Sequence, residues 1–402
     1  MKIVVFNVRH GANLGDQLIA ECLAAELRAA DAAATVVTED LAGRDAPQTG
    51  AGTRGMRVAA LAILAALPGS LRQMVAGRML DRLVGRRLMP RRRSLLADAD
   101  AIVIGGGGIF ADSDLNFPKK IAAALRAAAE RDLPVAIHAV GVSPHWSRAG
   151  RRLFGEGLSA ARLSGISVRD DRARDLWNAE LSGYTLPAVT IAPDPALTLS
   201  AHFPATPTRR GGPTHIGLCL TSPTALRYHG RDTWSARAIE QWYCALAAEL
   251  TRRGHVVVGF TTGTIEDDRF AAAIETRFVA ATGGKGRIAP TCTSAAELVS
   301  LIGEFHGLVA HRLHALIVGY AAAIPGLALA WDAKMVGQME MLGHPDRLLD
   351  PKRSTATETA DRLDAIIADG VDLDRRDALI AEARASTQAL MRTLRAAVTA
   401  HG

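Results

Sequence analysis

Two histidines and one arginine stand within the four residues His311-Arg312-Leu313-His314, directly after the apolar segment Gly307–Ala310. The apolar run ALIVGYAAA follows, so the pattern predicts a strand, this basic cluster and a helix over His311–Ala323. Free N–H groups in the first turn of a helix attract anions, whereas cations placed there are unfavourable by themselves. The cluster therefore indicates a site for a multiply charged anion. The alternative is that its histidines are structural.

Four other segments carry small or charged residues where a strand-like run ends. They are Asn13-Leu14-Gly15-Asp16, Gly105-Gly106-Gly107-Gly108, Ala139-Val140-Gly141-Val142-Ser143-Pro144 and Ser167-Val168-Arg169-Asp170. Ligands of open parallel sheets bind outside the carboxyl ends of the strands. We therefore expect these loops to line a cleft, with the following residues at its surface: Asn13, Gly15, Gly106, Gly107, Gly141, Asp194 and His311.

Two charged residues of these loops each allow two interpretations. Asp16 would accept a proton from an attacking hydroxyl, or it would only cap the next helix. Arg169 would aim its guanidinium into the cleft, or it would pair at the surface with Asp170 or Asp171.

Two further segments carry charged groups near the predicted rim. Trp331-Asp332-Ala333-Lys334 ends a later strand, and Lys334 would add one more cation there. Asp112-Ser113-Asp114 resembles the D-x-D metal signature of some glycosyltransferases, but so short a match is common by chance. We expect no metal and no cofactor.

Short apolar, β-branched runs alternate with longer helical patterns along most of the chain, as in parallel sheets covered by helices. Strands are predicted at Lys2–Val8, Thr35–Thr38, Ala101–Gly105, Pro134–Gly141, Gly165–Arg169, Val189–Ala192, Thr214–Leu220, Val256–Thr261, Gly307–Ala310 and Gly326–Ala330. Helices are predicted at Asp16–Ala30, Phe117–Arg131, Arg148–Leu163, Asp170–Glu180, Ser235–Arg253, Asp267–Ala280, Ser294–Phe305 and His311–Ala323, and over most of the tail from Thr357 to Ala400.

The expected fold is α/β, with two Rossmann-like domains facing a cleft (GT-B-like) and a C-terminal helical segment. The first domain would cover residues 1–203 and include an Arg-rich insert at 54–93. The second would cover 212–350, after a Pro-, Thr- and Gly-rich linker within His202–Thr214, and the C-terminal helices would cover 351–402.

The positive charge of the chain is concentrated between Arg54 and Arg93. This stretch holds ten arginines and one acid, Asp81, although the net charge of the whole chain is only +6. Apolar residues recur within it at helical spacing, so it would either lie on an anionic membrane surface or form a solvated helical face. Aromatic residues make up 4% of the chain and no nucleic-acid reader motif accompanies the charge, so we expect no nucleic-acid partner.

The expected location is cytoplasmic, with peripheral attachment to the inner face of the membrane left open. The four cysteines are scattered, which fits a reducing compartment. The N-terminus lacks the order of a signal peptide. The longest apolar run, Val58–Leu67, has ten residues, against the roughly 20 that span a bilayer.

The ordered set N-L-G-D, the glycine run, A-V-G-V-S-P, S-V-R-D, A-P-D-P, H-R-L-H-A-L-I and W-D-A-K resembles the polysaccharide pyruvyl transferase family, from about residue 7 to residue 343. The Arg-rich insert and the C-terminal helices fall outside the shared pattern. The resemblance implies a GT-B-like fold, phosphoenolpyruvate as donor, and a product that carries a pyruvate ketal on a sugar of a surface polysaccharide or its precursor.

The resemblance also implies roles for individual residues. Arg169 and Arg312 would grip the carboxylate and phosphate of the donor, helped by the backbone N–H of Leu313. His314 would stand at the reacting enol and is the candidate general acid, with Asp16 as the candidate base; these two roles are exchangeable.

Two other functions fit parts of the pattern. A nucleotide-sugar glycosyltransferase of the same architecture would place Arg312 and Lys334 on a diphosphate. A non-catalytic scaffold at the membrane surface would use the Arg-rich stretch, but it would leave the strand-end clusters unexplained. The acceptor sugar and the oligomeric state are not determined by these patterns.

Overall fold

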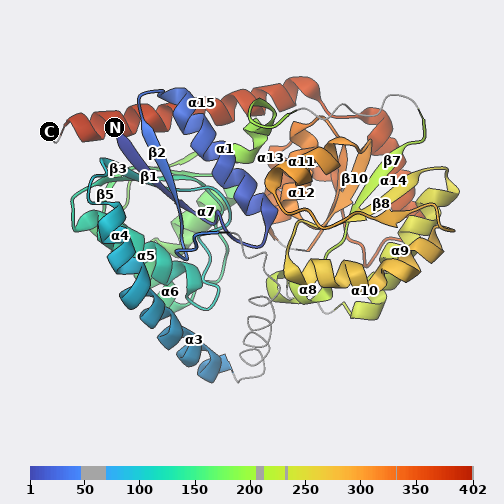
Figure 1. Ribbon diagram of the computed structural model, residues 1–402, viewed down its shortest axis with the longest axis horizontal. Helices are drawn as coiled ribbons and strands as arrows, with labels where there is room; N and C mark the ends of the chain where they lie inside the picture. The colour runs from blue at the N-terminus through green and yellow to red at the C-terminus, as the bar shows by residue number, and fades with distance from the viewer. Residues whose placement is uncertain (47–68, 205–211, 231–233, 332, 401–402) are drawn as a thin grey trace. The chain divides into compact units, whose positions relative to one another are not determined.

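The computed structural model describes residues 1–46, 69–204, 212–230, 234–331 and 333–400 (Figure 1). The chain divides into two compact units. Unit 1 comprises Met1–Gly11, Asp16–Pro195 and Glu382–Gly402, and unit 2 comprises Ala12–Gly15 and Ala196–Ala381. Each unit is built on its own parallel six-stranded sheet.

The sheet of unit 1 has the strand order β2-β1-β3-β4-β5-β6. Its strands are β1 (Lys2–Asn7), β2 (Thr35–Asp40), β3 (Ala101–Gly105), β4 (Pro134–Val140), β5 (Arg162–Val168) and β6 (Val189–Ile191). Both faces are covered, because alternate residues of β3 enter different cores: Ile102 and Ile104 one, Ala101 and Val103 the other.

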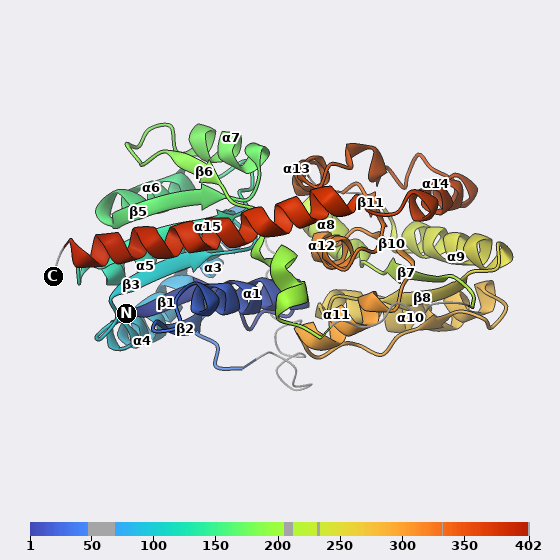
Figure 2. The same cartoon turned by 90° about the horizontal axis from the view of Figure 1, so that it is seen from above.

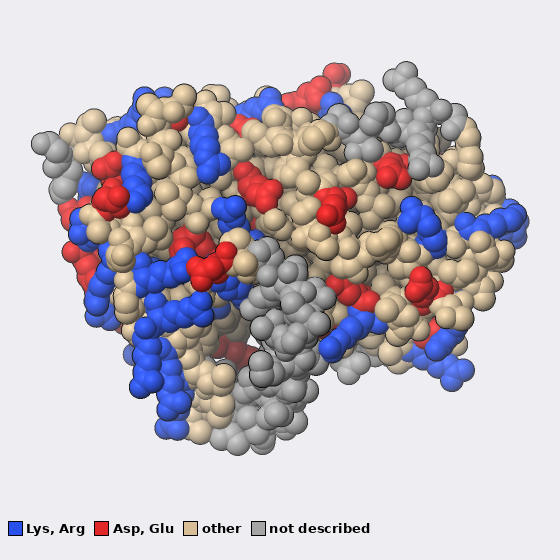
Figure 3. Space-filling model, viewed as in Figure 1, with Lys and Arg blue, Asp and Glu red and all other residues tan. Residues whose placement is uncertain are grey.

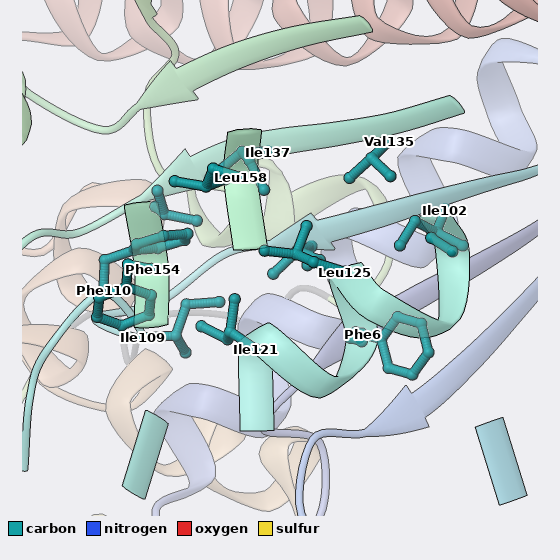
Figure 4. Packing of buried hydrophobic residues seen from close by; sticks show 14 of the residues in the cluster. Phe6, Ile102, Ile109, Phe110, Ile121, Leu125, Val135, Ile137, Phe154 and Leu158 are labelled. Carbon is teal, nitrogen blue, oxygen red and sulfur yellow. The ribbon is translucent and has the colours of Figure 1, made fainter. Parts of the chain in front are cut away.

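One face of this sheet packs on helices that lie between β2 and β6 in the sequence. They are α4 (Met89–Leu95), α5 (Asn116–Ala129), α6 (Arg148–Ala160) and α7 (Asp171–Glu180), and α3 (Gly69–Leu83) and the π-helix η1 (Val84–Leu88) precede α4. Figure 4 shows this core, in which Phe110 stacks on Phe154 with ring centroids 4.9 Å apart. A fully buried side chain of this size stabilises the fold by roughly 1.5–3 kcal/mol.

The other face of the sheet packs on α1 (Leu14–Ala30) and on the C-terminal part of α15 (Leu373–Thr399), which lies over the sheet in Figure 2. Leu23 and Leu27 of α1 and Leu390 and Leu394 of α15 share one cluster with the sheet. Residues near both ends of the chain thus form the core on this face of the sheet.

The sheet of unit 2 has the order β12-β11-β10-β7-β8-β9. Its strands are β7 (His215–Cys219), β8 (Val256–Phe260), β9 (Arg287–Ile288), β10 (Gly307–Ala310), β11 (Gly326–Leu329) and β12 (Leu348–Leu349). The helices of this unit are α8 (Pro223–Gly230), α9 (Ala236–Arg252), α10 (Ile265–Ala281), α11 (Ala295–Gly303), α12 (Leu313–Ala321), α13 (Ala333–Met341) and α14 (Ala356–Asp369); the 3₁₀ turns η2 (Pro195–Ala201) and η3 (Pro345–Arg347) complete the element order. Leu246 of α9, Phe278 of α10 and Leu363 of α14 pack on one face of the sheet.

Polar residues set where several helices begin. Ser147 Oγ accepts from the Gly150 N–H at 3.0 Å to start α6, and Ser294 Oγ accepts from Glu297 N–H to start α11. Thr355 and Glu358 form a reciprocal capping box at α14. These caps satisfy amide groups that the first turn of a helix leaves without an intrahelical acceptor.

The α/β fold with two Rossmann-like units is confirmed, and every predicted strand has a counterpart within a few residues. Several details differ. The two-residue strands β9 and β12 and the helices α8 and α13 were not predicted. The helix α6 ends at Ala160 and not at Leu163, because β5 begins at Arg162. The helix α12 begins at Leu313 and not at His311, and the boundary between the units falls inside α15. The first part of the Arg-rich insert, residues 54–68, and residues 205–211 of the predicted linker lie outside the described residues.

Candidate functional site

Each sheet has one point at which the order of its strands reverses. In unit 2 the chain proceeds from β7 to β8 and β9 on one side, and then returns to β10 on the other side of β7. Ligands of open α/β sheets bind at the carboxyl ends of the strands at such a point. In unit 2 those ends lead into Leu220–Ser222 after β7 and into His311 and Arg312 after β10.

Arg312 is the N-cap residue of α12 and is 9% exposed. Its Nε donates to Oδ2 of Asp267 at 2.8 Å. Its Nη2 forms an ion pair with the same oxygen at 2.6 Å and donates to the Thr264 hydroxyl at 3.3 Å. The guanidinium lies 5.5 Å from the ring centroid of Trp331. Arg312 is therefore held in one orientation at the entrance to the helix, where anions are favoured.

Asp267 is the residue that fixes this arrangement, and it was not predicted from the sequence. It is fully buried in the first turn of α10, and its Oδ1 accepts the Ser222 N–H at 2.8 Å. One carboxylate thus joins the loops that follow β7, β8 and β10. The only signal was the pattern Thr264-Ile265-Glu266-Asp267, which resembles an ordinary helix cap; in the structure the Thr264 side chain does not cap α10.

His311 precedes Arg312 in the chain and belongs to a buried polar network. It is 1% exposed, and its Nδ1 is 2.9 Å from the hydroxyl of Tyr243, which also accepts the Thr221 N–H at 3.1 Å and lies 3.2 Å from the Cys219 carbonyl. Burial raises the pKa of the Tyr243 hydroxyl and of the Cys219 thiol, so both stay neutral. His311 is therefore buried next to Arg312 and contacts Tyr243, and it is not at the surface of the site.

His314 is half-buried in the first turn of α12, and it packs on the segment Ala12–Gly15 of the same unit. A Cβ on Gly15 would lie 2.4 Å from the Cβ, Cγ and Nδ1 of His314. The segment is anchored by the Leu14 N–H, which donates to the Thr262 carbonyl at 2.9 Å. Glycine at position 15 is therefore required for the imidazole to occupy this place.

Asn13 takes the capping role that was considered for Asp16. It precedes α1, and its side-chain oxygen accepts the Gly15 N–H at 3.1 Å. Asp16 is the third residue of α1, where a carboxylate is favoured by the helix dipole.

The strand order of unit 1 reverses between β1 and β3. The loop after β3 is the glycine run, and Gly106 and Gly107 both have φ of +73°. A Cβ on Gly106 would lie 2.1 Å from a methyl of Ile19, and one on Gly105 would lie 2.7 Å from Leu23, so much of the run is explained by the approach of α1. Gly107 faces Asp16, whose Oδ1 would be 3.6 Å from a Cβ there.

Arg169 follows β5 in unit 1 and is 2% exposed, so it is not the surface arginine that one interpretation predicted. Its guanidinium lies on Gly141, where a Cβ would be 2.9 Å from its Cζ. Nε donates to Oδ2 of Asp170 at 3.2 Å, and Oδ1 of Asp170 accepts the Ala173 N–H at 2.7 Å as the cap of α7. The predicted cleft residue Asp194 is fully buried just after β6.

Asp112, the first residue of the D-x-D pattern, accepts backbone N–H groups from Leu115 at 2.9 Å and from Ser147 at 2.6 Å. It therefore has a structural role in its loop. Among the described residues, no group of three or more His, Cys, Asp or Glu residues could hold a metal ion. The Lys334 side chain lies outside what is described, and the residue itself is at the start of α13.

Residues 13–333 match the family model described as polysaccharide pyruvyl transferase. This chain belongs to the polysaccharide pyruvyl transferase family. The matched range includes Asn13, Arg169, Arg312 and His314, and it ends one residue before Lys334. No curated protein matches the sequence.

Solved structures show the fold that this pyruvyl transferase family member shares with other enzymes. A UDP-GlcNAc 2-epimerase from Neisseria meningitidis, bound to UDP-GlcNAc, aligns with 12% identity and a TM-score of 0.54, covering 98% of this chain and 99% of its own. An epimerase from Methanocaldococcus jannaschii aligns with 10% identity and a TM-score of 0.55, covering 91% and 93%. An α,α-trehalose 6-phosphate synthase from Burkholderia multivorans aligns with 14% identity and a TM-score of 0.52, covering 100% and 95%. The shared architecture is the GT-B fold.

Proposed function

We propose that the chain transfers the enolpyruvyl group of phosphoenolpyruvate to a sugar of a polysaccharide or its precursor, forming a pyruvate ketal and releasing phosphate. The observation that carries this proposal is Arg312, held by Asp267 and Thr264 at the entrance to α12 in a chain of this family. Phosphoenolpyruvate presents a carboxylate and a phosphate, and a planar, permanently charged fork suits either group.

The proposed chemistry begins with a proton at the methylene carbon of the donor. His314 is the proposed acid, because it lies two residues from Arg312 and its ring is confined by Gly15. Protonation makes C2 electrophilic, and a sugar hydroxyl then forms a bond to C2 while losing its proton. Phosphate leaves as its bond to C2 breaks, and a second hydroxyl of the same sugar closes the ketal and gives up its proton to solvent or phosphate.

The Leu313 backbone N–H is a further proposed contact to the donor. Leu313 is the first residue of α12, so its amide has no intrahelical acceptor. The binding role of Arg169, the base role of Asp16 and the binding role of Lys334 stay predictions, as do a cytoplasmic location and the absence of a cofactor. Within the described residues, no helix is both long and apolar enough to cross a membrane.

The test is an acceptor screen that monitors phosphate release from phosphoenolpyruvate, with mass spectrometry to detect the added pyruvyl group. Arg312→Ala and His314→Ala should each lower the rate with a responsive acceptor by roughly 10²–10³-fold. Arg312→Ala leaves the buried Asp267 carboxylate without a counter-charge. Arg312→Lys is therefore needed as a second variant, because it keeps the positive charge and removes the planar guanidinium. Arg287→Ala, an exposed arginine on β9, is the matched control and should keep the wild-type rate.

Wild-type rates in both Arg312 variants and in His314→Ala would contradict the proposal. A nucleotide-sugar glycosyltransferase is the rival outcome, and thermal unfolding distinguishes the two. Phosphoenolpyruvate at 100 times its dissociation constant should stabilise the protein by about 2.7 kcal/mol, and UDP-GlcNAc should not. Stabilisation by UDP-GlcNAc alone would favour the glycosyltransferase.

A further inference from the structure

In the described part of the Arg-rich region, one row of arginines makes no ion pair with an acid. Arg78, Arg82 and Arg86 are spaced four residues apart along α3 and η1, and all three are exposed. Within the described ranges, none of the three makes an ion pair. Their positive charge is therefore not neutralised by the fold itself.

Other charged residues of the same region are paired. Asp81 binds Lys119 Nζ at 2.7 Å, Arg91 binds Glu39 and Asp45, both at 2.5 Å, and Arg93 binds Glu130 at 2.7 Å. Arg78, Arg82 and Arg86 thus differ from these paired residues, and from an ordinary solvated face, on which arginines and acids are interspersed.

Two methionines stand beside the row. Met74 is 47% exposed and Met79 is 55% exposed, and they are two of the three large hydrophobic side chains that are exposed in the described part of the chain. At about 100° per residue, Met74, Arg78, Arg82 and Met79 fall within roughly 140° of the helix circumference. We define the α3 face as Met74, Arg78, Met79, Arg82 and Arg86.

The helix α3 is fixed to α5 of unit 1 next to the edge of this face. Lys119 of α5 donates to the Gly77 carbonyl at 2.8 Å and also pairs with Asp81. The α3 face is therefore presented by a docked helix. Figure 3 shows Lys and Arg side chains gathered over the surface where Figure 1 places α3 and α4.

We propose that the α3 face docks on a membrane surface that is rich in anionic lipid. Arginines without acidic partners are attracted to anionic headgroups, and the methionines on either side of them bury apolar surface at the boundary with the acyl chains. A nucleic acid would use the charge but leave the methionines in water, and no aromatic side chain of the α3 face offers a stacking surface. This inference concerns a surface, and it does not depend on the proposed transferase activity.

The test is flotation of the full-length protein with vesicles of phosphatidylcholine alone or with 30% phosphatidylglycerol (a chosen composition of roughly one-third anionic lipid). We expect binding only to the anionic vesicles, and loss of that binding in salt of about 1 M, where the Debye length is about 3 Å. The triple variant Arg78→Gln/Arg82→Gln/Arg86→Gln should lower the partition coefficient roughly 100-fold. The double variant Met74→Ser/Met79→Ser should lower it roughly tenfold.

The matched control is Arg148→Gln/Arg152→Gln/Arg172→Gln. These three arginines are also exposed, lie on α6 and α7 of the same unit, and make no ion pair within the described residues, so the net charge changes equally. The control should retain vesicle binding within about twofold. The proposal is overturned if the wild-type protein does not bind anionic vesicles, or if the control loses binding as strongly as the test variant. It is also overturned if heparin or RNA binds with the same dependence on the row and the methionine variant changes nothing.

Discussion

The strand-end loops of the two units differ in what they contain. Unit 1 holds unusual backbone: Gly106 and Gly107 have φ of +73°, and the non-glycine residues Ser113, Asp114 and Leu115 also have positive φ. In unit 2 the loop after β8 has one such glycine, Gly263 with φ of +87°, and the feature that stands out is the buried ion pair of Arg312 with Asp267 at 2.6 Å, shorter than the 3.2 Å pair of Arg169 with Asp170 in unit 1. Positive φ at a non-glycine residue costs on the order of 1–3 kcal/mol, and breaking a buried ion pair costs about 3–5 kcal/mol. Only the ion pair fixes a charged group, the Arg312 guanidinium, at the first turn of a helix.

The same difference separates two buried Arg–Asp pairs. Arg312 has two contacts with Asp267, a hydrogen bond of 2.8 Å and an ion-pair contact of 2.6 Å, and it donates once to Thr264. Arg169 has a single contact of 3.2 Å with Asp170, and its guanidinium lies on Gly141. Arg312 is thus fixed by charge, whereas Arg169 is fixed mainly by the space that a glycine leaves.

The largest effect is expected for Asp267→Asn. The substitution leaves the Arg312 guanidinium buried without its counter-charge, and the free energy of unfolding should fall by about 3–5 kcal/mol. Asp170→Asn removes one contact and keeps a residue that caps helices as well as Asp, so its loss should be about 1.5–3 kcal/mol. Urea unfolding of both variants measures the difference. Equal losses would mean that the two pairs are equivalent.

A pH effect is expected in unit 1. Burial lowers the pKa of His138, on β4, to about 4, and its ring nitrogens are 3.1 Å from the Ser167 hydroxyl and 3.4 Å from the Thr387 hydroxyl of α15. The pKa in the unfolded chain is about 6.5, so the unfolded state binds more protons between these values and stability falls as the pH drops through this range. The loss from pH 6.5 to 4 should be on the order of 3 kcal/mol.

Thermal unfolding of the wild type and of His138→Gln over this pH range tests the effect. The variant should lose less stability on acidification, because one group that titrates on unfolding has been removed. Parallel curves for the two proteins would assign the acid sensitivity to other groups.

A packing effect of about 1–3 kcal/mol is expected for Gly15→Ala, because the new methyl group would overlap the Cβ and ring of His314. Alanine is otherwise preferred over glycine in a helix by about 1 kcal/mol, so a net loss would be due to this contact. Gly85→Ala is the matched control, since a Cβ there meets nothing within 4 Å. The Gly15 variant should unfold at lower temperature and release phosphate more slowly; a variant as stable and active as the control would contradict the placement of His314.

The sequence predicted the strands because each is a short, apolar, β-branched run. The strand-end rule then selected the loops after β1 and β3 at the reversal point of unit 1 and the loop after β10 at that of unit 2, but not the loop after β7. The strands β9 and β12 carry no such pattern. Each has only two residues, which is too short for a sequence pattern to show. Asp267 was missed because it lies 45 residues before Arg312, and only the order of the strands brings them together.

The predicted cleft position of Gly106 stays a prediction, because the structure shows only what lies on the Cβ side of this glycine. A glycine in the sequence does not reveal its neighbour; the structure shows that Ile19 of α1 occupies the space on the Cβ side of Gly106. A buried charged residue says more about its neighbours than a glycine does, because a buried charge requires a group of opposite charge or a hydrogen-bond partner nearby.

The smallest effect, and the one that best separates the two arginines, is expected for Gly141→Ala. A Cβ at this position would lie 2.9–3.2 Å from the guanidinium of Arg169, which would have to shift by a few tenths of an ångström. The end of a long side chain moves cheaply, so the free energy of unfolding should change by less than about 1 kcal/mol. If Arg169 binds the donor carboxylate equally in the ground state and the transition state, the KM for phosphoenolpyruvate should rise about tenfold with kcat little changed. Gly165→Ala, on β5, is the control, because a Cβ there meets nothing within 4 Å. An unchanged KM would mean that Arg169 supports α7 through Asp170 and that donor binding relies on the charges of unit 2.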